Sequence, residues 1–133
     1  MSALRALHWP RLWLGLWGLM IAAVIAGSLA PPAALPQIWF PGADKLQHLA
    51  GYVVLSGYAA MLFASRRALG LAAGGLVLLG ILIEGAQWAL TASRQADPID
   101  VLANLGGVAL GQTLGMTRAA GLLQWADRRL SGR

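Results

Sequence analysis

The sequence has no cysteine and very little charge. Without cysteine, neither a disulfide framework nor a thiolate metal site is available. Charged residues make up only 11% of the 133 residues, whereas hydrophobic residues make up 58%. Soluble domains carry about 25% charged residues, so this chain is too apolar for an ordinary soluble protein.

Acidic side chains are the scarcest charged group, with only five in the chain. Four of them lie at the edges of long apolar runs or just inside them: Asp44, Glu84, Asp97 and Asp100. The fifth, Asp127, follows the last run. Ionisable groups at membrane depth are costly, so they usually pair, face a cavity or carry a function. The function is therefore sought among the first four.

The apolar residues form four runs, covering residues 12–30, 46–64, 68–90 and 99–116. Each run has a length within the range of about 17–25 residues that a transmembrane helix needs. The later connections are short, which makes neighbouring helices antiparallel. The sequence thus predicts an all-α integral membrane protein, with residues 1–133 forming one domain of four antiparallel transmembrane helices.

The ten basic residues are distributed unevenly and give a formal charge of +5. Eight of them lie before the first run, between the second and third, or after the fourth. By the positive-inside rule these segments are cytoplasmic, which places both termini inside. The arginines there are expected to contact membrane lipids, and no nucleic-acid partner is predicted.

The two ends of the chain have patterns of their own. Residues 12–30 exceed the usual signal-peptide core of about 7–15 residues, which favours an uncleaved anchor. Residues 117–133 are predicted to form a short cytoplasmic helix at the membrane interface. Its apolar residues are expected to face the membrane: Leu122, Leu123, Ala126 and Leu130. An aromatic and apolar patch at residues 38–40 is expected at the outer interface.

Polar residues form one stripe on each of the last three predicted helices. At about 100° per residue, the members of each stripe fall within one arc of their helix. The stripes are Lys45, His48, Tyr52 and Ser56, then Glu84, Gln87 and Thr91, then Asp97, Asp100 and Asn104. In the predicted topology they lie in the outer half of the bilayer and wall one pocket that opens outward. Ala103, Gly107, Gly111 and Gly115 beside the third stripe are interpreted as helix packing.

Several kinds of chemistry remain open to this pocket. Glu84 or Asp100 could act as a base with His48 as a proton relay. Lys45 and Arg94 could clamp a phosphate or carboxylate. The acidic oxygens could instead bind a divalent cation such as Mg²⁺ or Ca²⁺, and no other cofactor is predicted. No Walker A, HExxH, EF-hand or nucleophile-elbow motif is present.

The polar residues also have structural explanations. Glu84 could form a buried ion pair with Lys45 or Arg94 that fixes helix register. Gln87 and Asn104 are common hydrogen-bonding residues between membrane helices. Holding four helices together does not require so many ionisable groups at one end, so their concentration favours a site.

This ordered set resembles the pattern of the VanZ-like family of small bacterial membrane proteins. The matching residues are Asp44, Lys45, His48, Tyr52, Glu84, Gln87, Arg94, Asp97, Asp100 and Asn104, followed by Gly107 and Gly111. The resemblance covers residues 41–115 and implies a cell-envelope protein of the bacterial inner membrane. The family's namesake is associated with low-level resistance to teicoplanin, a glycopeptide antibiotic that acts on cell-wall precursors.

Three functions are compatible with these residues. The first is binding of a lipid-linked or amphiphilic cell-envelope ligand, such as a cell-wall precursor or a glycopeptide. Its ligand-binding residues would be Lys45, Tyr52, Gln87, Arg94, Asp97 and Asn104. The second is a membrane-embedded hydrolase or transferase with Glu84, Asp100 and His48 as catalytic residues. The third is a structural protein that acts through partners. No oligomeric state is predicted.

Overall fold

The computed structural model describes residues 2–31, 34, 40–90 and 97–132. These ranges form five α-helices and one isolated β-bridge, between Leu4 and Phe63. The helices are α1 (Pro10–Leu29), α2 (Ala43–Leu62), α3 (Arg66–Leu90), α4 (Pro98–Thr113) and α5 (Leu122–Leu130). Two short 3-10 helices, η2 (Leu114–Met116) and η3 (Arg118–Gly121), connect α4 to α5. The all-α prediction is confirmed for the described residues.

The four long helices begin and end within three residues of the predicted apolar runs. Prolines occupy the first turn of α1 and of α4, where the missing N–H costs no hydrogen bond. Asp97 caps α4, because its Oδ1 accepts from the backbone N–H of Ile99 at 2.9 Å. Gly42 precedes α2 with a φ of 82°, in the left-handed region that favours glycine.

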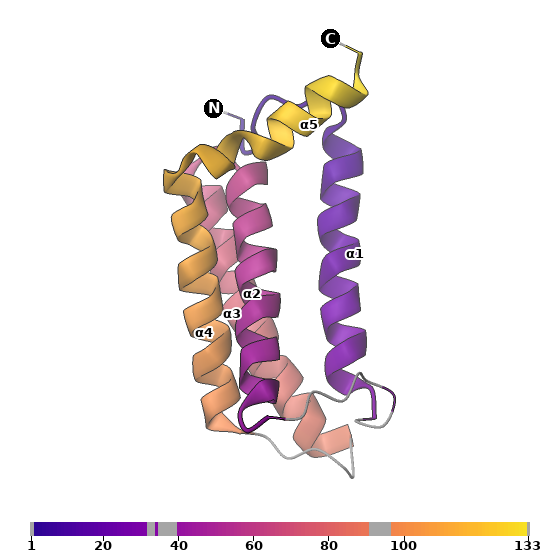
Figure 1. The fold of residues 1–133 in the computed structure, drawn as a ribbon, viewed down its shortest axis with the longest axis vertical. Coiled ribbons are helices and arrows are strands. Elements are labelled where there is room, and N and C mark those ends of the chain that lie inside the picture. The colour runs from indigo at the N-terminus through magenta and orange to yellow at the C-terminus, as the bar shows by residue number, and fades with distance from the viewer. Residues whose placement is uncertain (1, 32–33, 35–39, 91–96, 133) are drawn as a thin grey trace.

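Helices α2, α3 and α4 form a compact group, α1 lies to one side of it, and α5 crosses the end where both termini lie (Figure 1). Helix α2 packs most extensively against α4. A Cβ added at Gly107 would lie 2.5 Å from the backbone oxygen of Leu49. One added at Gly111 would lie 2.6 Å from that of Val53. The glycines of α4 therefore allow the close approach that their spacing predicts.

Two helices, α1 and α3, are long and apolar enough to cross a membrane, each with a mean hydropathy of 2.0. Only Trp13 of α1 is buried. Large apolar side chains such as Leu71 and Leu102 are more than half exposed, whereas Glu84 and Asn104 are buried. An apolar exterior around polar interior groups suits a lipid environment better than water.

The N-terminal segment and α5 close one end of the bundle around Asp127. This carboxylate is only 1% exposed. It accepts hydrogen bonds from the backbone N–H of His8 at 2.6 Å and of Trp9 at 3.1 Å. The His8 ring nitrogen Nδ1 and the indole N–H of Trp13 each lie 2.8 Å from it. Asp127 thus anchors the two residues just before α1, a helix whose own N-terminus has no side-chain cap.

The charge state of Asp127 follows from these contacts. Burial opposes ionisation of its carboxyl group and acts to raise the pKa. The hydrogen bonds from His8, Trp13 and Trp9 outweigh that effect and hold the pKa well below its ordinary value. Asp127 is therefore an anion that fastens α5 to the start of α1.

Helix α5 lies where the sequence predicts a short helix, but its apolar residues are divided between two directions. Leu123 is buried against Trp13, and Ala126 packs on the same cluster. Leu122 and Leu130 are exposed. The prediction that Leu122, Leu123, Ala126 and Leu130 all face the membrane is therefore wrong for Leu123 and Ala126, which pack against the bundle. The buried Asp127 on this helix requires the adjoining side chains to pack inward with it.

Candidate functional site

The polar stripes of α2, α3 and α4 meet at the end of the bundle opposite the two termini. The first turns of α2 and α4 and the last turns of α3 lie at that end (Figure 1). Eight of the nine predicted site residues are described by the structure. Arg94 lies outside the described residues, as do Thr91 and the patch at 38–39.

Lys45 lies at the rim of this end and is engaged by three carboxylates. Its Nζ is 2.7 Å from Asp44 Oδ2, 2.8 Å from Asp97 Oδ2 and 3.1 Å from Asp100 Oδ1. The ammonium, helped by the backbone N–H of Ile99, holds the pKa of Asp97 below its ordinary value. Because this positive charge is already paired within the protein, Lys45 is poorly placed to clamp an anionic ligand. The expected pairing of Lys45 with Glu84 is replaced by pairing with residues of α4 and with its neighbour in α2.

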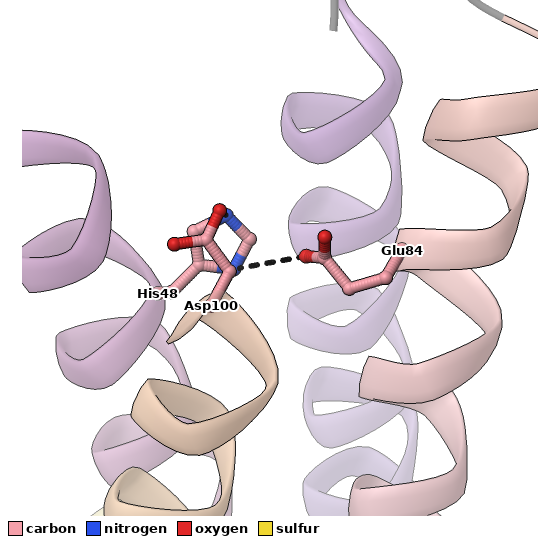
Figure 2. Close-up of side chains that lie close together, drawn as sticks. All are labelled: His48, Glu84 and Asp100. Atoms are coloured by element: carbon pink, nitrogen blue, oxygen red, sulfur yellow. Dashed lines mark ion pairs between the residues drawn. The ribbon is translucent and has the colours of Figure 1, made fainter. Parts of the chain in front are cut away.

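Inside this rim, His48 lies between two buried carboxylates from different helices. Its Nδ1 is 3.9 Å from Glu84 Oε1, and its Nε2 is 3.8 Å from Asp100 Oδ2. Figure 2 shows Glu84 extending from α3 toward His48 on α2 and Asp100 on α4. One ligand atom from each residue lies within 4.8 Å of the others, so the group could hold a metal ion.

Three buried polar atoms near this cluster have no hydrogen-bond partner among the described residues: Tyr52 OH, Glu84 Oε1 and Asn104 Nδ2. The other atoms of two of these groups are engaged. Glu84 Oε2 accepts from the backbone N–H of Asp97 at 3.2 Å, and Asn104 Oδ1 lies 3.1 Å from His48 Nδ1. Buried polar atoms are nearly always hydrogen-bonded, so three such atoms in one place indicate a site that something else completes.

Two other predicted polar residues connect helices. Gln87 Nε2 donates to the backbone oxygen of Ser28 at 2.8 Å and so joins α3 to the end of α1. Ser56 Oγ donates to the backbone oxygen of Val108 at 2.8 Å and accepts from Gln112 Nε2 at 3.1 Å. The deeper part of the α2 stripe therefore links α2 to α4.

A cavity of about 180 Å³ lies between α1 and α2, next to the cluster. Its lining residues are Val24, Gly27, Ser28, Gln47, His48, Gly51 and Tyr52. His48 and Tyr52 thus belong to both the cavity and the polar end. A second cavity of about 290 Å³ lies between α1 and α3 and has an apolar lining that includes Trp17 and Leu79. Sequence reasoning missed both, because they depend on how far α1 lies from the other helices.

Gly80 is a further site residue that sequence reasoning missed. A Cβ added there would lie 3.0 Å from Asn104 Nδ2 and 3.2 Å from Tyr52 OH. The bare backbone of α3 therefore makes room for these two buried polar groups. The available signal is its position four residues before Glu84, on the same face of the helix.

Comparisons with models of protein families, with curated proteins and with solved structures found no match. Functional inference therefore rests on the residues of the chain. The cluster can bind a cation, or move a proton between His48 and a carboxylate. The adjoining cavity can hold part of an apolar or amphiphilic molecule.

Proposed function

We propose that this chain is a VanZ-like protein of the bacterial inner membrane that binds a lipid-linked or amphiphilic cell-envelope ligand at its outer end. The observation that carries the proposal is the cavity between α1 and α2. Its wall changes from apolar at Val24 to polar at His48 and Gln47. A cavity with that gradient fits a molecule whose apolar and polar parts adjoin.

A four-span topology is part of this proposal. Helices α1 and α3 qualify as spans by length and hydropathy. Helices α2 and α4 carry more polar residues, but Ser56, Asp100 and Asn104 are buried in the bundle, whereas Val54 and Leu110 are exposed. Eight of the ten basic residues flank the end that holds the termini, which favours the cytoplasm for that end. The polar cluster then faces outward.

The size of the cavity limits the kind of ligand. Pockets that enclose a drug-sized molecule measure about 300–1,000 Å³. A cavity of about 180 Å³ is smaller, so it would hold one portion of a long molecule whose remainder lies in the lipid. The apolar cavity between α1 and α3 offers a place for a hydrocarbon chain on the other side of α1.

The polar groups around the cavity favour a hydroxyl- or amide-bearing headgroup. Gln47 and His48 line it, and the charge of Lys45 is already paired. Arg94 remains the sequence-based candidate for contact with a phosphate. A lipid-linked cell-wall precursor combines a hydrocarbon chain, a phosphate and a headgroup with hydroxyl and amide groups. Binding of such a precursor would connect the protein to glycopeptide tolerance.

Gly51→Leu tests the proposal, because Gly51 lines the cavity and lies outside the ion-pair network. A Cβ at this position meets only Val24, at 3.9 Å, so the leucine would fill the cavity. Gly74→Leu is the matched control, since nothing lies within 4 Å of an added Cβ there. Native mass spectrometry of protein gently extracted from its own membrane should show an amphiphile on the wild type and on the control. The filled variant should lack it.

Retention of the same amphiphile by Gly51→Leu would contradict binding in this cavity. A second readout is the teicoplanin concentration that inhibits growth of a susceptible host expressing each form. We expect the wild type and Gly74→Leu to raise it and Gly51→Leu to have no effect. Equal concentrations for all three forms would disconnect the protein from glycopeptide tolerance.

A second candidate function is a membrane-embedded hydrolase or transferase. The placement of His48 between Glu84 and Asp100 favours it, because an imidazole beside a buried carboxylate can accept and relay a proton. In that case liposomes made from the host's own lipids should accumulate a new lipid species with the wild type but not with Glu84→Gln. Identical lipid profiles would exclude turnover of any lipid in the extract.

A further inference from the structure

We propose that His48, Glu84 and Asp100 form a binding site for a divalent transition-metal cation, with Zn²⁺ the best match. The three residues come from three helices and point at one another (Figure 2). The inference does not depend on the proposed function, because the cation would bind whether or not an amphiphile enters the neighbouring cavity.

The distances are close to those of a metal centre. A tetrahedral ion with ligands at about 2.0–2.1 Å holds its ligand atoms about 3.4 Å apart. Here Nε2 of His48 is 3.8 Å from Asp100 Oδ2, and one ligand atom of each of the three residues lies within 4.8 Å of the others. Small side-chain rotations are sufficient to bring these atoms onto one ion.

The hydrogen bond to His48 prepares the ring for this role. Asn104 Oδ1 lies 3.1 Å from Nδ1, and an amide oxygen can only accept, so Nδ1 carries the proton. In the neutral ring Nε2 then directs its lone pair toward the Asp100 carboxylate at 3.8 Å, and a cation between the two atoms would be bound by both. Metal-binding histidines typically donate their other ring N–H to an oxygen in this way.

Glu84 supplies the second, independent observation. The residue is 4% exposed, and its Oε1 has no hydrogen-bond partner among the described residues. This oxygen is the one nearest the His48 ring. A buried carboxylate oxygen that lacks a donor is costly, and coordination to an ion removes that cost.

The balance of charge at this end also favours a bound cation. The described residues bring four carboxylates together with a single ammonium, that of Lys45. Lys45 contacts three of the four, and Glu84 has only the His48 ring within ion-pair distance among the described residues. Buried negative charge in lipid requires compensation, which a dication supplies.

The ligand set selects the metal. Two carboxylates alone would suit Mg²⁺ or Ca²⁺, which prefer oxygen ligands. One imidazole added to two carboxylates, with no cysteine in the chain, favours Zn²⁺ or a similar first-row ion. Three protein ligands leave the fourth tetrahedral position open.

The test uses the whole chain, purified in detergent, stripped with a chelator and titrated with ZnCl₂. Metal retained after desalting is counted by mass spectrometry, and Co²⁺ is added separately as a coloured probe. We expect the chain to retain one equivalent of Zn²⁺. Bound Co²⁺ should show the absorption band of a low-symmetry site, and adding Zn²⁺ should abolish that band by displacing the Co²⁺. Glu84→Gln and Asp100→Asn should weaken affinity by more than about 100-fold, beyond the loss usual for residues behind the ligands.

Asp44→Asn is the matched control, since it removes a carboxylate that is 59% exposed at the same end. It should bind Zn²⁺ like the wild type, and so should Gly51→Leu, which alters only the neighbouring cavity. Failure of the metal site and failure of ligand binding are thereby separable. If wild-type protein retains no metal and leaves the Co²⁺ spectrum that of the hydrated ion, the proposal is overturned. Wild-type affinity in folded Glu84→Gln would overturn it as well.

Discussion

Asp127→Asn should loosen the end of the bundle that holds both termini, although the substitution exchanges one carboxylate oxygen for an NH₂ group and hardly changes the volume. The carboxylate receives contacts from two backbone N–H groups, one indole and one imidazole. An asparagine keeps one oxygen, which can accept the hydrogen bonds from the Trp9 backbone N–H and the Trp13 indole N–H. Its NH₂ group replaces the oxygen that faces His8 and meets donors there.

The magnitude follows from the two contacts that are lost. Hydrogen bonds to a charged group contribute about 1.5–3 kcal/mol each. The His8 side chain is 39% exposed, so water can replace part of what is lost. We therefore expect a loss of about 3 kcal/mol in the free energy of unfolding, by the lower end of that range. At roughly 3 °C per kcal/mol for a chain of this size, the melting temperature should fall by about 10 °C.

The assay is thermal unfolding in detergent, followed by far-ultraviolet circular dichroism at several pH values. The pKa of Asp127 is lowered by folding from an ordinary value of 3.8, so its contribution is complete above that value. The difference between wild type and variant should stay constant from neutral pH to about pH 5 and shrink as the pH falls below about 4. Asp44→Asn, which removes an exposed carboxylate, is the control. A loss no larger than that of the control, or one that persists unchanged in acid, would refute this account of the Asp127 contacts.

Three further substitutions test the polar end and the helix contact beneath it. Gly107→Ala should lower stability by about 1–3 kcal/mol or more, because its methyl group would meet the Leu49 backbone oxygen, whereas Gly106→Ala should be neutral or stabilising. Equal melting temperatures for these two variants would show that α2 and α4 do not need the close contact. Gly80→Ala should weaken Zn²⁺ binding, measured by titration, because it displaces the asparagine amide that orients the histidine. Lys45→Met should lower the melting temperature from pH 7 down to about pH 4 and progressively less below that, because Lys45 lowers the pKa of Asp44 and Asp97 and these carboxyl groups lose their charge only in stronger acid. A loss that does not shrink as the pH falls below about 4 would rule out ion pairing as the cause.

Much of the bundle was predictable because its signals are local. Apolar runs, Pro10 and Pro98 in first turns, and small residues at every fourth position of α4 each depend on a few neighbouring residues. The meeting of three polar stripes also followed, since helix periodicity and antiparallel order leave them little choice. The sequence did not predict which carboxylates pair with Lys45. Four carboxylates lie at this end of the bundle, and the rotation of each helix about its axis determines which three of them contact the ammonium.

The features that sequence reasoning missed depend on distant contacts. Asp127 lies in a segment rich in arginine, where an acidic residue is usually solvated. Two of its four partners are backbone N–H groups, which leave no signal in the residue types. The one available hint was its spacing of four residues from Leu123, on the inward face of α5. The cavities were equally hidden, because they arise from the separation between α1 and the bundle.

The position of Asp127 has a consequence for the order in which the protein is made. Its partners at His8 and Trp9 precede it by 119 and 118 residues. Helix α1 leaves the ribosome long before residue 127 is synthesised. Until then the backbone N–H groups of His8 and Trp9, just before α1, lack the carboxylate that accepts from them in the folded protein. The start of the first helix to be synthesised is thus fixed in place only after the last helix, α5, has been made.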